Sequence, residues 1–171
     1  MSLALRLDDV HLQKLTVLAA VATAKAIEKL SGEKVAIKWV NDIYLGNKKL
    51  CGILSERIDN AVVIGIGVNL SVKVFPEEIK DIAVNLKTDI SRNKLAVQIT
   101  NNILALLSSN EDFMQYYREK SILIGKKIAY IKNGETYTGI ALDIDDSGAL
   151  VVEDEEKNIL MLTSGDVMLL K

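Results

Sequence analysis

The sequence predicts an α+β protein in which an antiparallel or mixed sheet packed with helices is followed by a small β-barrel. Two observations predict this class. Residues 10–70 combine one long helical pattern with four short β-rich runs, and residues 122–171 contain five more such runs after a second helical stretch. With 171 residues, of which 49% are hydrophobic, the chain is long enough for one compact core and a small second domain.

The first helix is predicted over residues 10–30, where apolar residues recur at helical spacing. Asp8 or Asp9 can cap its start, because a carboxylate there accepts a hydrogen bond from a free backbone N–H group. Gly32 lies where a helix of this length would end.

Four β-rich runs follow this helix and are separated by residues that form tight turns. The turn formers are Asn41-Asp42, Gly46-Asn47 and Asp59-Asn60. Short runs joined in this way predict antiparallel hairpins and a meander rather than a βαβ unit. The runs cover residues 35–39, 43–45, 49–58 and 61–70.

The second half of the chain is predicted to hold further helices and the barrel. Pro76 precedes two glutamates and suits the opening of a short helix, and a longer helical pattern runs from about residue 94 to residue 118. Five short strands after it are expected to form a closed or nearly closed barrel, since closure hides edges that so short a sheet could not protect. The predicted domains are residues 1–121 and 122–171, and the predicted barrel strands are residues 127–131, 137–144, 149–153, 159–162 and 167–170.

Charge, cysteine content and hydropathy exclude several classes of function. The chain has 21 Lys and Arg against 23 Asp and Glu, and residues 122–171 carry a net charge of −4, which disfavours a nucleic-acid-binding barrel. The single cysteine, Cys51, excludes an internal disulfide, and one cysteine with one histidine cannot build a zinc-type metal site. No secretory leader and no apolar run long enough for a bilayer occur, so a cytoplasmic protein without a membrane segment is predicted.

Residues 38–56 contain the first candidates for chemistry. Lys38 ends a predicted strand just before a turn, where a fixed backbone can present a cation to a phosphate or carboxylate oxygen, although an isolated lysine there would also suit the surface. Gly52 interrupts an apolar run and permits either a bulge or the close approach of a ligand. Asn41 and Asp42 are expected to be structural turn residues, because their side chains can fold back onto the local backbone.

A second glycine-bearing segment, Gly65-Ile66-Gly67-Val68-Asn69, lies inside a predicted strand. It is not the phosphate loop of a dinucleotide-binding fold, because that loop requires a strand, a turn and a helix in succession. Its asparagine can donate and accept hydrogen bonds at once, and the alternative for this residue is a turn at the end of the strand.

These two segments resemble the signatures of biotin protein ligases. Residues 65–69 resemble the second signature, residues 122–171 resemble the SH3-like barrel that ends bacterial members, and the resemblance covers the whole chain. It implies a catalytic domain of the class II synthetase-like ligase fold, followed by that barrel. The residues that match the first signature in register are Lys38, Trp39, Asn41, Asp42, Gly52, Ile53 and Glu56.

The resemblance also implies roles for individual residues. In the family, the lysine that matches Lys38 contacts biotin and the activated phosphate, so Lys38 is expected to be catalytic and to bind biotin or biotinyl-AMP. Gly52 and Ile53 are expected to line the biotin pocket. The residues expected on the nucleotide side are Gly67, Val68 and Asn69.

The family joins biotin to ATP, with magnesium, and transfers biotin from biotinyl-AMP to a lysine of the biotin carboxyl carrier protein of acetyl-CoA carboxylase. The Gly/Arg-rich loop that precedes the first signature in the family does not occur in the 171 residues, nor does a DNA-binding helix-turn-helix. An incomplete ligase without a nucleic-acid partner is therefore expected, and the alternative is a non-catalytic binding module derived from a ligase. Self-association as a homodimer is also expected, with residues 49–58 or 61–70 contributing exposed sheet edges.

Overall fold

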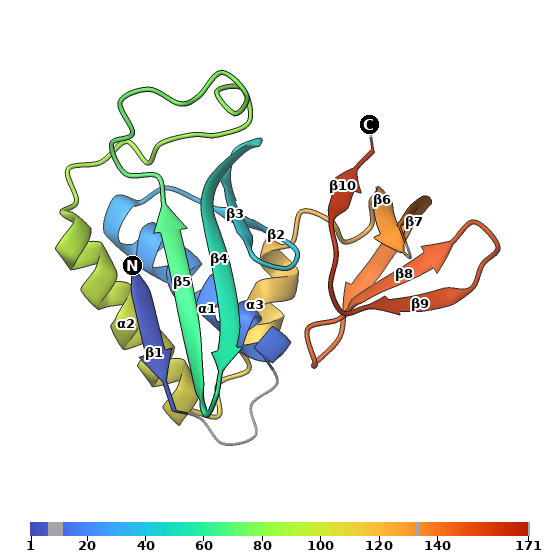
Figure 1. Ribbon diagram of the computed structural model, residues 1–171, viewed down its shortest axis with the longest axis horizontal. Helices are drawn as coiled ribbons and strands as arrows, with labels where there is room; N and C mark the ends of the chain where they lie inside the picture. Colours follow the sequence, from blue (N-terminus) through green and yellow to red (C-terminus); the bar gives the residue numbers. More distant parts are fainter. Residues whose placement is uncertain (7–11, 133, 171) are drawn as a thin grey trace.

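The computed structural model describes residues 1–6, 12–132 and 134–170, and it contains two five-stranded sheets (Figure 1). The first sheet has the strand order β1-β5-β4-β3-β2, and the second has the order β10-β6-β7-β8-β9. Every strand pair in both sheets is antiparallel, so the predicted meander and the predicted α+β class are confirmed. The proposed helix caps Asp8 and Asp9, and the only histidine, His11, lie outside the described residues.

The helices and strands have the following bounds. The first sheet contains β1 (Ser2–Leu5), β2 (Ala36–Lys38), β3 (Asp42–Leu45), β4 (Lys48–Ile58) and β5 (Ala61–Val68). The helices are α1 (Leu12–Ser31), α2 (Arg92–Ser108) and α3 (Phe113–Lys120). The second sheet, called the barrel below, contains β6 (Lys127–Lys132), β7 (Glu135–Ile144), β8 (Leu150–Asp154), β9 (Ile159–Leu162) and β10 (Val167–Leu169).

The first sheet has one covered face and one open face. Its helices lie behind it in Figure 1, and the alternate residues Val62, Ile64 and Ile66 of β5 are buried on that side. The opposite face, called the open face below, carries no helix in the part of the chain that the structure describes. No helix among the described residues is long and apolar enough to cross a bilayer.

Two predictions about the segment between the sheets were wrong. The single helix predicted over residues 94–118 is two helices, because Asp112 caps α3 by accepting a hydrogen bond from the N–H of Met114 at 3.0 Å. The segment after Pro76 forms turns rather than a helix, with the N–H groups of Ile79 and Lys80 both donating to the Pro76 carbonyl.

The expected sheet edges were wrong for β5 and right for only part of β4. β5 lies between β1 and β4 and is internal, but β3 pairs only with residues 48–52 of β4, so residues 54–58 of β4 have a strand partner on the β5 side alone. The edges of the first sheet are β1 and β2. Chain order predicted the meander, but β1 comes from the start of the chain and covers the outer side of β5.

The barrel is attached to the first sheet through the turn that joins β7 to β8. The carbonyl of Gly148 accepts hydrogen bonds from Nε2 of Gln13 at 2.7 Å and from the indole Nε1 of Trp39 at 2.8 Å. Gly148 has a φ of +90°, and a Cβ at this position would lie 3.0 Å from Cγ2 of Val17. This turn therefore depends on a glycine both for its backbone conformation and for its fit against α1.

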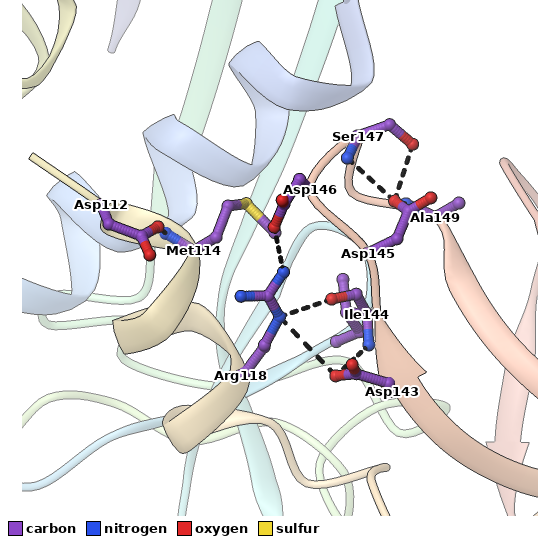
Figure 2. A network of polar contacts seen from close by, with 9 residues as sticks. All are labelled: Asp112, Met114, Arg118, Asp143, Ile144, Asp145, Asp146, Ser147 and Ala149. Atoms are coloured by element: carbon purple, nitrogen blue, oxygen red, sulfur yellow. Dashed lines mark hydrogen bonds and ion pairs between the residues drawn. The ribbon is translucent and has the colours of Figure 1, made fainter. Parts of the chain in front are cut away.

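An arginine of α3 also holds this turn (Figure 2). Nε of Arg118 donates to the carbonyl of Ile144 at 2.6 Å, and its guanidinium pairs with Asp146 and lies 3.6 Å from Asp143. Within the turn, one carboxylate oxygen of Asp145 accepts hydrogen bonds from Ser147 and Ala149. The turn between β7 and β8 thus fixes the barrel to the helices through several hydrogen bonds.

Gly139 of β7 is predicted to be the least replaceable glycine of the barrel. An added Cβ would lie 2.5 Å from the backbone oxygen of Glu153 and 2.7 Å from Cγ1 of Val152, and neither strand can move without disturbing the pairing. Gly139→Ala should lower the free energy of unfolding by about 1–3 kcal/mol, measured by denaturant titration. The control is Gly65→Ala, where the nearest atom is 3.7 Å away, and a smaller loss at Gly139 than at Gly65 would contradict the prediction.

Asp145 should make the stability of the turn depend on pH. Burial alone would raise the pKa of Asp145, but hydrogen bonds from Ser147, Ala149 and Gly148 outweigh it and hold the pKa below its ordinary value of 3.8. A lowered folded-state pKa stabilises the protein above the unfolded pKa, and this contribution disappears as the pH falls through the folded value. The difference in unfolding free energy between the parent and Asp145→Asn should therefore narrow in acid, and a constant difference would contradict this.

Candidate functional site

The register of the first sheet places four residues in one row across the open face. Lys38 pairs with Asp42, Asp42 pairs with Gly52, and Gly52 pairs with Gly67. Directly paired residues of neighbouring strands point to the same side of a sheet, and the neighbours Ile37 and Ile53 are buried on the other side. The chain thus brings together the predicted site residues Lys38, Gly52 and Gly67, which are up to 29 positions apart in sequence.

A cavity of about 330 Å³ lies at the glycine end of this row, and Lys38 and Asp42 are not among its lining residues. Its floor contains Gly52 and Gly67, which have no side chains to fill the space. Residues of the segment between β5 and α2, which lies above the first sheet in Figure 1, also line it. Asn69 lies on its wall, where its N–H donates to Leu50 at 2.9 Å and its Nδ2 to Lys49 at 3.4 Å. The other lining residues are Cys51, Ile79, Ile82 and Ala83.

Two of the predicted site residues face the helices instead. Ile53 is 2% exposed and packs in the core, while its N–H donates to Asn41 at 2.9 Å and its carbonyl accepts from the Asn41 amide at 2.7 Å. Val68 lines a different cavity, of about 400 Å³, together with Ile66 and Ile99. The side chains of Ile53 and Val68 therefore support the sheet from behind, which sequence spacing alone could not distinguish from lining the site.

The predicted turn residues act across the sheet rather than within the turn. The Asn41 amide bonds to β4, as described above, and the carboxylate of Asp42 forms an ion pair with Lys49 at 2.6 Å. Lys49 lies on the cavity wall and was not singled out from the sequence, because nothing in its neighbours distinguishes it from an ordinary strand lysine.

The turn after Lys38 is held by groups that come from α3 and the barrel. Trp39 is 3% exposed and donates to Gly148, and the hydroxyl of Tyr117 donates to the carbonyl of Val40 at 2.9 Å. Burial raises the pKa of the Tyr117 phenol, so the hydroxyl keeps the proton that it donates. Tyr117 thus helps to fix the backbone just after Lys38.

The site offers neither a thiol nucleophile nor a metal cage among the described residues. Cys51 is 1% exposed, and burial, reinforced by the nearby Asp42 carboxylate, raises the pKa of its thiol to about 12. No group of three or more His, Cys, Asp or Glu able to hold a metal ion occurs in residues 1–6, 12–132 and 134–170. The polar groups of the row and the cavity include the side chains of Lys38, Asp42, Lys49 and Asn69.

Family comparisons match consecutive parts of this chain. The model of the biotin/lipoate A/B protein ligase family matches residues 2–72, and that of the biotin protein ligase C-terminal domain matches residues 123–170. The bifunctional ligase/repressor BirA of Bacillus spizizenii is 37% identical over 190 residues, covering 99% of this chain and 57% of that protein. The biotin–[acetyl-CoA-carboxylase] ligase of Mycobacterium tuberculosis is 29% identical over 187 residues, covering 100% of this chain and 69% of that protein.

Solved structures agree with these matches. The apo structure of the biotin protein ligase from Aquifex aeolicus has a TM-score of 0.88 and 25% identity, covering 99% of this chain and 80% of that chain. The same ligase in complex with biotin and ATP has a TM-score of 0.80 and 26% identity, covering 99% and 77% of the two chains. The chain therefore belongs to the biotin protein ligase family, and its α+β fold with a terminal SH3-like barrel is confirmed. It spans 57% of the length of the two Bacillus ligase/repressors that it matches.

Cys51 is predicted to be inert in the folded protein. Because its pKa is about 12 and its side chain is buried, almost no thiolate is available to attack an alkylating reagent at mildly alkaline pH. Iodoacetamide should label the protein rapidly in denaturant and negligibly in buffer, as followed by mass spectrometry. Fast labelling of the folded chain would show that the thiol is accessible and acidic.

Proposed function

We propose that this chain carries part of the biotinyl-AMP site of a biotin protein ligase. The observation that supports it is the row of Lys38, Asp42, Gly52 and Gly67, whose two glycines line a cavity together with Asn69. A floor of two glycines lets a ligand approach the backbone, and a cation at one end can bind an anionic group. The complex of the Aquifex aeolicus ligase with biotin and ATP is consistent with such ligands.

The proposed reaction has two steps. In the first, an oxygen of the biotin carboxylate attacks the α-phosphorus of ATP, the bond to the β-phosphate breaks, and pyrophosphate leaves. In the second, a lysine amine of the biotin carboxyl carrier protein attacks the acyl carbon of biotinyl-AMP, forming an amide, losing a proton and releasing AMP. Both steps develop negative charge on oxygen, which a nearby ammonium group stabilises.

Lys38 is assigned the catalytic role in this proposal, as the ammonium group near the biotin carboxylate and the α-phosphate. Asn69 is assigned to the adenine, whose edge needs a donor and an acceptor, with the backbone of Gly67 beside it. Gly52 is assigned to the biotin side. Ile53 and Val68 are assigned a supporting role behind the sheet, since their side chains point to the helices.

The proposal extends to metal, partners and domains. Magnesium would enter with the phosphates of ATP, as is usual for this ion, because the described residues offer no cage for it. The acceptor is proposed to be a biotin carboxyl carrier protein, and residues 1–121 and 122–171 are proposed as the ligase and barrel domains. A homodimer would use the edge strands β1 or β2, or residues 54–58 of β4, rather than the internal strand β5.

Calorimetry on the 171-residue chain, with biotin and with a hydrolysis-resistant biotinyl-AMP analogue, tests the proposal. Lys38→Ala should weaken binding of the analogue by roughly 10- to 100-fold, the value of one charge-assisted hydrogen bond of about 1.5–3 kcal/mol. Lys34→Ala, at an exposed position, is the matched control and should bind like the parent.

Two results would contradict the proposal in different ways. If the parent chain binds neither ligand, the assignment of the site as a whole is wrong. If the parent chain binds and Lys38→Ala binds with the same affinity, only the role of Lys38 is wrong. Biotin-dependent exchange of labelled pyrophosphate into ATP then separates an active ligase from a binding module.

A further inference from the structure

A one-residue bulge in β4 directs Lys49 to the open face. Ile43 pairs with Cys51 and Tyr44 pairs with Lys49, so Leu50 is an extra residue without a partner in β3. Side chains alternate along a strand, and Lys49 would otherwise share the buried side of Cys51. Bulges commonly redirect a side chain beside a functional site.

The ammonium group of Lys49 lies over the glycine floor. A Cβ added at Gly52 would lie 3.4 Å from Cε and 3.5 Å from Nζ of Lys49, and 3.7 Å from a carboxylate oxygen of Asp42. The Asp42–Lys49 ion pair therefore spans the place where a side chain is missing. The Lys49 side chain is 44% exposed, so its charged end remains accessible from the cavity.

The backbone of Lys49 is fixed while its side chain extends into the cavity. Its N–H donates to Ile82 at 2.7 Å, and its carbonyl accepts from the N–H of Val84 at 3.0 Å and from the Asn69 amide at 3.4 Å. These bonds tie Lys49 to the segment between β5 and α2, which lines the cavity, and to Asn69, the residue assigned to the adenine. A charged group held in this way is organised before a ligand arrives.

We propose that Lys49 is a second ligand-binding cation of this site, whose ammonium group binds a carboxylate or phosphate oxygen of the ligand above Gly52 and Gly67. Asp42 orients it. The open face then carries two ammonium groups, those of Lys38 and Lys49, and the carboxylate of Asp42, and the anion of the ligand balances the remaining positive charge. This inference rests on the proposed function, because it concerns the same cavity.

The test compares charged ligands with neutral counterparts. Lys49→Met removes the charge but keeps an apolar stem, and Lys49→Arg keeps the charge. Calorimetry would measure biotin against biotinamide, which lacks the carboxylate, and AMP against adenosine, which lacks the phosphate. The adjacent Lys48→Met is the matched control, since the Lys48 ammonium bonds to the Lys80 carbonyl instead.

We expect Lys49→Met to lose roughly 10-fold or more in affinity for biotin, for AMP or for both. Its affinity for the neutral counterpart, biotinamide or adenosine, should equal that of the parent. Lys49→Arg should recover most of the loss. The pair that responds identifies the anion as carboxylate or phosphate. If Lys49→Met unfolds in a thermal melt, Lys49→Gln replaces it in the same comparison.

The other outcomes overturn the inference. Equal losses for charged and neutral ligands would mean that Lys49 only shapes the cavity. Unchanged affinity for all four ligands, with a parent that binds, would remove Lys49 from the site and leave the proposed function intact. A parent that binds none of them would overturn the proposed function and this inference together.

Discussion

The antiparallel pairing of β2, β3, β4 and β5 is the constraint on which the site depends. Pairing decides that Lys38, Gly52 and Gly67 share one face, and the bulge at Leu50 adds Lys49 to that face. A slip of one residue in any of these strands would turn its side chains to the helices. Burial of apolar side chains on the covered face therefore fixes the register of the strands, because a slip of one residue would expose these side chains to solvent.

The barrel and α3 contribute to the same arrangement from a distance. The carbonyl of Gly148 holds the Trp39 indole, and the hydroxyl of Tyr117 holds the carbonyl of Val40, on either side of one peptide bond. Lys38 is the residue before this pair. The barrel thus bonds to the residue next to Lys38, although none of its strands lines the cavity near Gly52.

Much of the fold could be predicted from patterns along the chain. Helix α1 and the hairpins of β2 to β5 follow from apolar periodicity and from turn formers such as Asn41-Asp42. The break between α2 and α3 was missed because Leu106 and Phe113 continue an apolar pattern across it. Asp112 ends that continuity with a local hydrogen bond, which periodicity does not detect.

The sequence by itself determined the family resemblance, the order of helices and strands, and the identity of Lys38, Gly52, Gly67 and Asn69 as candidates, since each lies in a signature that is local in the chain. Only the tertiary structure decided which of them meet. The side of the sheet on which a residue lies depends on the register with another strand, and a single bulge reverses it. For this reason Ile53 and Val68, although inside the signatures, face the core, while Lys49, to which the sequence drew no attention, lies over the glycine floor.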